Sequence, residues 1–203
     1  MLRQLDHVVY VVRDLRAAIE DHQRRGFTVT AGGDHADRLT QNALIPFADG
    51  SYLELVAFRD LDRSLTHRWW NIAAGGGGIA DFALLSDDLA SDTAALGALV
   101  SGQPLPGGRL RPDGVELRWR TAILKPPLPF LIEDLTARDL RVPGGAAREH
   151  ANGATGIATV VVGTKEPTDA EWGYAALRER GAPAVELRES ARDGLIDVRF
   201  RSS

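Results

Sequence analysis

Short apolar runs alternate with amphipathic stretches along the chain, and turn residues separate them. The run 5–12 is rich in valine and predicts a buried strand. Asp14 then stands where a helix N-cap is expected, and Gly26 stands where that helix should end. Three further strands are predicted by the runs 27–30, 39–47 and 51–58. An Asp-Gly turn joins the last two, so the opening segment predicts the order β-α-β-β-β.

The same order of elements returns in the middle of the chain. The run 78–85 predicts a strand, and Asp87 or Asp88 is placed to cap a helix that continues through Val100. Gly102 is placed to end this helix. Two later strands are predicted by the runs 115–124 and 128–135. The first of them again follows an Asp-Gly turn, so this segment predicts a second unit of the same kind.

A partial third copy follows the second. The run 155–162 predicts a strand, and a helix is predicted over 168–180, where Thr168 and Glu171 have the spacing of a capping box. Two final strands are predicted by the runs 184–189 and 195–201. The three copies begin at nearly equal intervals, which is typical of a repeated supersecondary unit.

These patterns predict an α+β protein built from repeated β-α-β-β-β modules. The predicted division is a first module at 1–60, a linker at 61–77, a second module at 78–135, a loop at 136–154 and a partial third βαββ module at 155–203. The linker ends in consecutive glycines, which are typical of a flexible connection. The loop is also rich in glycine and predicts a connection on the surface.

The composition limits the chemistry that is available. The 203 residues carry a formal net charge of -4 and include no cysteine, which excludes disulfides, thiolate nucleophiles and cysteine-based metal sites. The arginines are scattered rather than gathered in a basic stripe, so no nucleic-acid partner is predicted. No apolar run is long enough to span a membrane, and no signal peptide is recognisable. These features favour a cytoplasmic location.

Several short motifs resemble a known superfamily when they are taken in order. The segments 5–9, 14–15, 26–29 and 52–56 resemble the vicinal oxygen chelate superfamily, and the segments 32–35, 40–44, 111–119 and 149–154 resemble its glyoxalase-like domain branch. The resemblance implies paired modules, each of which curls a mixed sheet into a half-barrel around a ligand cavity.

The resemblance implies small-molecule chemistry but assigns no substrate. The superfamily includes isomerases, epimerases, ring-opening dioxygenases and thiol transferases, and other members only bind and sequester drugs. For this chain it favours action on a small carbonyl- or enol-bearing molecule, assisted by a divalent metal. The alternative is a metal-free protein that binds or sequesters a small molecule without catalysis. A homodimer is a further expectation.

The first module offers two candidate metal ligands. His7 shares one strand face with Val9, and Glu54 shares one with Tyr52. The resemblance implies that both faces line the cavity, where imidazole and carboxylate would suit zinc, iron, manganese or nickel. The alternative is a hydrogen-bonded core histidine and a Glu54 that pairs with an arginine.

The second module departs from the metal pattern of the first. Its first strand aligns Asp81 with His7, and Glu133 is the matching carboxylate on its last strand. Glu54 or Glu133 would move a proton on the substrate. His150 is a further candidate for metal binding or proton transfer. The alternatives are an Asp81 bonded to backbone and a histidine that braces its loop.

Two groups of residues are candidates for substrate contact. His35 follows a glycine pair and reaches toward the strand that bears Asn42. Glu116 and Arg118 share one strand face and could recognise an anionic or carbonyl-bearing ligand, and Trp119 lies on the other face. Loop hydrogen bonds and a solvent-exposed charged face are the alternatives.

The linker tryptophans Trp69 and Trp70 could wall a pocket or pack the junction between modules. His22 and His67 are expected on the surface, without a role.

Overall fold

The computed structural model describes residues 1–62 and 65–202, and its first half contains four strands and one helix. These are β1 (Leu2–Val12), α1 (Leu15–Arg24), β2 (Thr30–His35), β3 (Thr40–Pro46) and β4 (Tyr52–Phe58). The Asp14 side chain accepts a hydrogen bond from the Ala17 amide, which confirms the predicted N-cap of α1. Gly26 follows the helix with a φ of 82°, a conformation that favours glycine.

The second half repeats this order after a short helix. Its elements are α2 (Trp70–Ala74), β5 (Gly78–Ser86), α3 (Leu89–Leu96), β6 (Leu105–Leu110), β7 (Glu116–Ala122) and β8 (Phe130–Asp134). Asp88 caps α3 by accepting a hydrogen bond from the Ser91 amide. The helix ends earlier than predicted, because Gly97 takes a φ of 50° and a 3-10 turn continues to Leu99.

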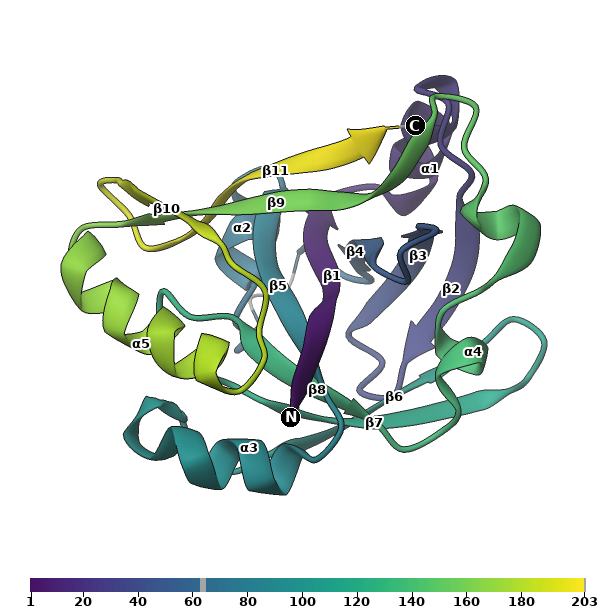
Figure 1. The fold of residues 1–203 in the computed structure, drawn as a ribbon. Helices are drawn as coiled ribbons and strands as arrows, with labels where there is room; N and C mark the ends of the chain where they lie inside the picture. The colour runs from purple at the N-terminus through teal and green to yellow at the C-terminus, as the bar shows by residue number, and fades with distance from the viewer. Residues whose placement is uncertain (63–64, 203) are drawn as a thin grey trace.

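The two halves join into one closed barrel, in the strand order β1-β4-β3-β2-β6-β7-β8-β5 (Figure 1). β1 pairs with β4 in parallel and with β5 in antiparallel orientation along most of its length. The other seam is short, because β2 and β6 pair only at Asp34 with Leu110 and at His35 with Arg109. The α+β class with mixed sheets is confirmed, and the predicted half-barrels close on each other.

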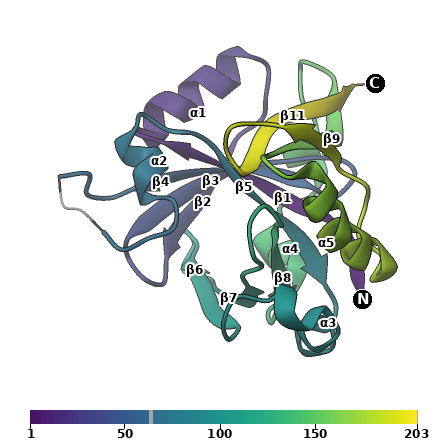
Figure 2. The ribbon, with the colours of Figure 1, turned by 90° about the vertical axis from the view of Figure 1, so that its left-hand side faces the viewer.

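A separate sheet lies across the outside of the barrel. It contains β9 (Ala154–Thr164), β10 (Glu186–Glu189) and β11 (Gly194–Ser202) in the order β10-β9-β11, with α5 (Pro167–Glu179) between its first two strands in sequence. Figure 2 shows this sheet and α5 on one side of the barrel, away from α2. Whether it is a third copy of the repeat stays a prediction.

Two predictions about local structure were wrong. Thr168 and Glu171 form no capping box, because α5 begins at Pro167, which suits the first helical turn and needs no amide partner. The connection 136–154 is not a plain surface loop. It contains the short helix α4 (Arg138–Arg141) and a 3-10 turn at 145–148, and Arg141 is only 2% exposed.

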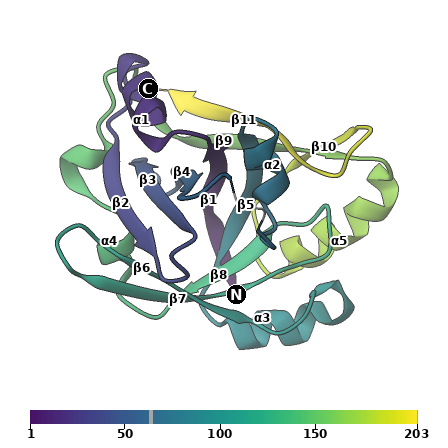
Figure 3. The ribbon, with the colours of Figure 1, turned by 180° about the vertical axis from the view of Figure 1, so that it is seen from behind.

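The strands pack apolar side chains on both of their faces, with one cluster inside the barrel and one outside it. One cluster lies within the barrel and includes Val9, Val56 and Phe130, together with Trp70 from α2. The larger cluster joins the outer faces of the strands to α1, α3, α5 and the separate sheet. Seen from behind, α2, α3 and α5 lie around the edge of the barrel (Figure 3). Among the described residues, no helix is long and apolar enough to cross a membrane.

Candidate functional site

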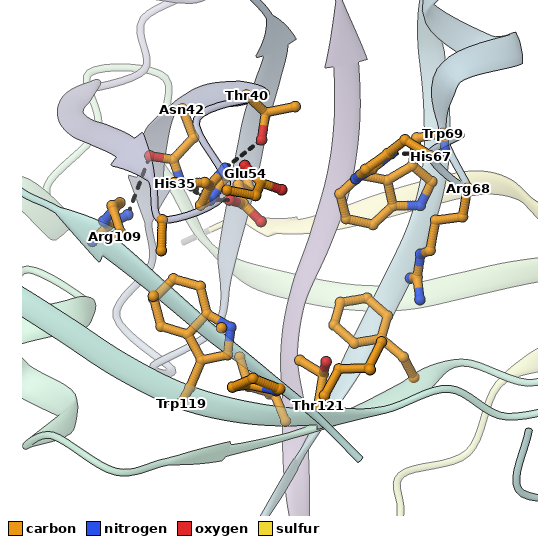
Figure 4. Close-up of a pocket in the computed structure, with 18 of the residues that line it drawn as sticks. His35, Thr40, Asn42, Glu54, His67, Arg68, Trp69, Arg109, Trp119 and Thr121 are labelled. Carbon is orange, nitrogen blue, oxygen red and sulfur yellow. Dashed lines mark hydrogen bonds and ion pairs between the residues drawn. The ribbon is translucent and has the colours of Figure 1, made fainter. Parts of the chain in front are cut away.

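A cavity of about 550 Å³ lies inside the barrel, which is large enough for a small organic ligand. Polar side chains from the first half lie on one side, and the segment before α2 lies on the other (Figure 4). Trp119 and Thr121 project from β7 between these two sides. Phe130 and Ile132 complete the apolar wall.

His7 and Glu54 meet at the wall of this cavity. The Nε2 atom of His7 lies 3.3 Å from Oε2 of Glu54, and both side chains are less than a tenth exposed. The phenol ring of Tyr52 stacks on the His7 imidazole with ring centroids 4.6 Å apart. The alternation of side chains along β1 and β4 therefore brings the two predicted residues together, as their shared strand faces indicate.

His35 and Asn42 contact the other oxygen of Glu54. Asn42 donates a hydrogen bond from Nδ2 to Oε1 over 2.5 Å, and Nε2 of His35 lies 3.4 Å from the same oxygen. The hydroxyl of Thr40 lies 2.7 Å from Nδ1 of His35 and fixes the ring from behind. Both predicted substrate-contact residues of the first module thus line the cavity beside Glu54.

A buried ion-pair network holds His7 from the opposite side. Nδ1 of His7 lies 2.6 Å from Oδ1 of Asp6, and Arg141 donates to both Asp6 oxygens over 3.0 and 2.9 Å. Arg141 also binds Asp134 and donates to the Tyr52 hydroxyl over 2.6 Å. No local sequence pattern predicts this network, because α4 lies far along the chain in a segment without strand or helix periodicity.

The network sets the charges of the site. Burial alone would raise the pKa of the Glu54 carboxyl, but hydrogen bonds from His35 and His7 hold it well below its ordinary value. Burial alone would lower the pKa of His7, but hydrogen bonds to Asp6 and Glu54 raise it. Burial would also raise the pKa of Asp6, and the charge of Arg141 keeps it well below normal. Glu54 and Asp6 are therefore anionic at neutral pH.

These shifts predict a pH dependence of folding stability. A raised pKa means that His7 contributes fully below its unfolded value of 6.5, and that this contribution disappears as the pH rises through the folded value. The lowered pKa values of Asp6 and Glu54 give stability above their ordinary values of 3.8 and 4.5, which is lost in acid. The network should therefore stabilise most between pH 4.5 and 6.5.

Replacing His7 by Gln should flatten the decline in unfolding free energy above pH 6.5. One proton accounts for a slope of at most about 1.4 kcal/mol per pH unit. Urea unfolding at several pH values between 5.5 and 9 measures the slope. His22→Asn is the matched control, because His22 is also buried but its ring bonds the Ala18 carbonyl. An unchanged slope in the His7 variant would refute the assignment.

Trp119 lies flat against the backbone of β6. A Cβ atom added at Gly107 would overlap the Trp119 indole, so only glycine leaves room for the ring. The indole also makes an edge contact with the His35 ring, with centroids 6.2 Å apart. Gly107 therefore allows Trp119 to form one wall of the cavity.

Gly107→Ala should displace this indole and destabilise the protein by about 1–3 kcal/mol, as overpacking usually does. Urea unfolding followed by tryptophan fluorescence measures both effects. Gly144→Ala should change the stability by less than about 0.5 kcal/mol, because a Cβ there meets no atom and the φ is -112°. Equal effects at the two positions would contradict the packing described.

Two residues without a predicted role also face the cavity. His67 lines it and makes edge contacts with Phe58 and Trp69. Arg109 lines it from β6 and is 4% exposed. The sequence signal for β6 is weak, since its proline and two glycines are unusual within a strand. Of the two linker tryptophans, Trp69 lines the cavity, whereas Trp70 packs in the apolar core.

The remaining predicted residues lie outside the cavity. Glu133 faces α3 on the outside of the barrel, where it accepts hydrogen bonds from the Leu89 amide and Arg120. His150 bridges backbone, accepting from the Thr28 amide and bonding the Pro46 carbonyl over 2.9 Å. Their positions do not support the catalytic or metal role predicted for Glu133, or the metal role predicted for His150.

The charged residues of β7 also lie away from the interior. Glu116 and Arg118 are exposed and line a second, outer groove beside β6. Asp81 lies on the inner face of β5 but forms an ion pair with Arg68 and accepts a hydrogen bond from the Phe82 amide. Of the predicted β7 contacts, only Trp119 reaches the cavity.

The side chains of the site do not fit a metal ion. A catalytic metal needs about three protein donors that point at one centre. Glu54 instead directs one oxygen at His7 and the other at Asn42 and His35, so its acceptor sites face protein donors. In residues 1–62 and 65–202, no group of three or more histidine, aspartate or glutamate side chains is arranged to hold a metal. The predicted ligand set is therefore not assembled.

Comparisons with known proteins agree on the fold. The family model of the glyoxalase-like domain matches residues 5–178. A hypothetical protein from Staphylococcus aureus superposes with a TM-score of 0.74 at 14% identity, over 95% of this chain and 88% of that one. Methylmalonyl-CoA epimerase from Streptomyces coelicolor, in complex with 2-nitronate-propionyl-CoA, superposes with a TM-score of 0.50 at 24% identity, over 67% of this chain and 100% of that one.

No curated protein sequence matches the chain. The solved structures share less than 25% identity with it and so establish the fold alone. The family match, in contrast, spans most of the chain and includes both halves of the barrel. The protein belongs to the glyoxalase-like domain family of the vicinal oxygen chelate superfamily.

Proposed function

We propose that this protein is an enzyme that moves a proton at a carbon next to a carbonyl or enol group, with Glu54 as the base. The observation that carries the proposal is an ionised carboxylate on the wall of a largely apolar cavity, flanked by two imidazoles. A carboxylate with a lowered pKa is available to accept a proton at neutral pH.

The neighbours of Glu54 support this role. Nε2 of His7 lies against one carboxylate oxygen, and its hydrogen bond keeps Glu54 ionised and oriented. Asp6 bonds the far nitrogen of that ring, which orients His7 and favours its charged form. Removal of a proton beside a carbonyl leaves negative charge on the substrate oxygen. The cations Arg109 and Arg68 line the same cavity and would stabilise that charge.

The experiment is a search for proton exchange. The protein would be incubated in D2O with ketones, 2-oxo acids and acyl thioesters, and deuterium incorporation beside the carbonyl would be followed by proton NMR. We expect exchange above the buffer rate for at least one compound that binds. Compounds that bind but show no catalysed exchange across the whole set would overturn the proposal.

A second candidate is a metal-free protein that only binds its ligand. The aromatic wall formed by Trp69, Trp119 and Phe130 favours it, because such walls bind flat apolar molecules without any chemistry. Quenching of tryptophan fluorescence would report binding, and recovery of unchanged ligand would support this candidate. Neither candidate uses the predicted metal assistance, because the side chains of the site do not fit a metal ion. The homodimer and the cytoplasmic location stay predictions.

A further inference from the structure

Two buried arginines lie side by side at the edge of the site, and only one of them has its charge balanced. Arg141 binds the carboxylates of Asp6 and Asp134 and also the Tyr52 hydroxyl. Arg109 donates only to neutral oxygens, to Oδ1 of Asn42 over 3.3 Å and to the Arg141 carbonyl over 3.0 Å. Within the described parts of the chain, no carboxylate lies within ion-pair distance of Arg109.

The charge of Arg109 cannot be removed by losing a proton, because a guanidinium stays protonated in proteins. A buried charge is costly unless a partner of opposite charge is present. Arg109 is 4% exposed, and its Nε atom is the buried side-chain nitrogen for which the described residues supply no acceptor. The side chain nevertheless lines the cavity, where a ligand could approach it.

We infer that Arg109 is the anchor of an anion-binding subsite, and that the ligand of this cavity is a small carboxylate with an apolar body. Asn42 links this subsite to the proposed base, since it accepts from Arg109 and donates to Glu54. Only the Asn42 side-chain amide then separates the carboxylate of the ligand from Glu54, so the carbonyl next to that carboxylate lies near the base. Trp69, Trp119 and Phe130 cover the apolar body.

This inference deepens the proposed function by naming its substrate class. A cavity of about 550 Å³ exceeds what a short oxo acid needs, so the apolar walls require a larger substituent. An aryl-substituted 2-oxo acid combines the three parts: a carboxylate for Arg109, a carbonyl for Glu54 and a ring for the aromatic wall. Arginine is suited to the first part, because its fork of N–H groups matches both oxygens of a carboxylate.

The test uses phenylpyruvate and its neutral methyl ester, titrated calorimetrically into the full-length protein. We expect the acid to bind wild type at least about tenfold more tightly than the ester. Arg109→Gln should weaken binding of the acid by about 10- to 100-fold and leave the ester within about twofold. Arg118→Gln removes an exposed arginine of the outer groove and should change neither affinity.

Equal affinity of the wild type for acid and ester, including no detectable binding of either, overturns the inference. So does an Arg109→Gln variant that still prefers the acid. If Arg109→Gln fails to fold, Arg109→Lys keeps the charge without the fork and should lose an intermediate part of the preference. Glu54→Gln separates the two proposals, because it should bind the acid as wild type does while losing proton exchange. If wild type binds the acid more tightly than the ester but catalyses no proton exchange, the proposed function is wrong and the inference about Arg109 stands.

Discussion

Replacing Glu54 by Gln is expected to slow proton exchange at a carbon beside a carbonyl by about 10²–10⁴-fold, the usual contribution of a positioned base. The amide keeps the size of the side chain and can still accept from Asn42, but it cannot take up a proton. Exchange rates in D2O, measured by proton NMR with a bound substrate, give the ratio. Most of the loss should appear in kcat rather than KM, because the removed interaction belongs to the transition state.

Glu133→Gln is the matched control, since this glutamate lies outside the barrel and should retain the wild-type exchange rate. The pKa of His7 is a second readout, which checks that Glu54 contacts the His7 ring in solution. Loss of the Glu54 charge should lower the pKa of His7, because the hydrogen bond that His7 donates to the Glu54 carboxylate helps to raise it. NMR titration of the His7 ring measures this shift. Wild-type exchange in the Glu54 variant would exclude it as the base.

Replacing Arg141 by Met is expected to destabilise the fold by about 3–5 kcal/mol, the usual effect of breaking a buried ion pair. Methionine fills much of the space but leaves Asp6 and Asp134 without their main counter-charge. Since folded domains are stable by about 5–15 kcal/mol, this is a large part of the total. Urea unfolding at pH 7 measures the change.

Two further variants show whether the cause is the unpaired charge. Arg118→Met removes an exposed arginine whose guanidinium pairs with no described residue, and it should cost less than about 0.5 kcal/mol. Adding Asp6→Asn to Arg141→Met should restore part of the lost stability, because the Asp6 carboxylate, left with only Arg138 and His7 as partners, is replaced by a neutral amide. A fully additive double variant would argue against coupling between these two residues.

Local patterns in the sequence predicted the parts of the fold that depend on neighbouring residues. The alternation along β1 and β4 showed which residues share a face with His7 and with Glu54, and the family resemblance implied that both faces point inward. Their approach to 3.3 Å follows from the parallel pairing of these strands. Asp14 and Asp88 were recognised as caps because a cap acts within one turn of its own helix. Each of these features requires only a few consecutive residues.

The rest of the site depends on contacts that no local pattern contains. Arg141 binds Asp6 across 135 positions, from a helix of four residues with no periodic signal. β6 was not predicted, because proline and glycine are rare in strands, and Arg109 was missed with it. Glu133 was expected in the site as the matching carboxylate on the last strand of the second module, but the alternation along β8 points Phe130 inward and Glu133 outward.

The two seams of the barrel differ in strength, and this difference has a consequence for access to the interior. The pairing of β1 with β5 runs along almost the whole strand, whereas β2 and β6 meet at only two residue pairs. One of these pairs, His35 with Arg109, consists of two residues that also line the cavity. A wall opens first where the fewest backbone hydrogen bonds hold it. The amides around the β2–β6 junction should therefore exchange with solvent sooner than those of β1. This junction is then the expected route by which a ligand enters the barrel.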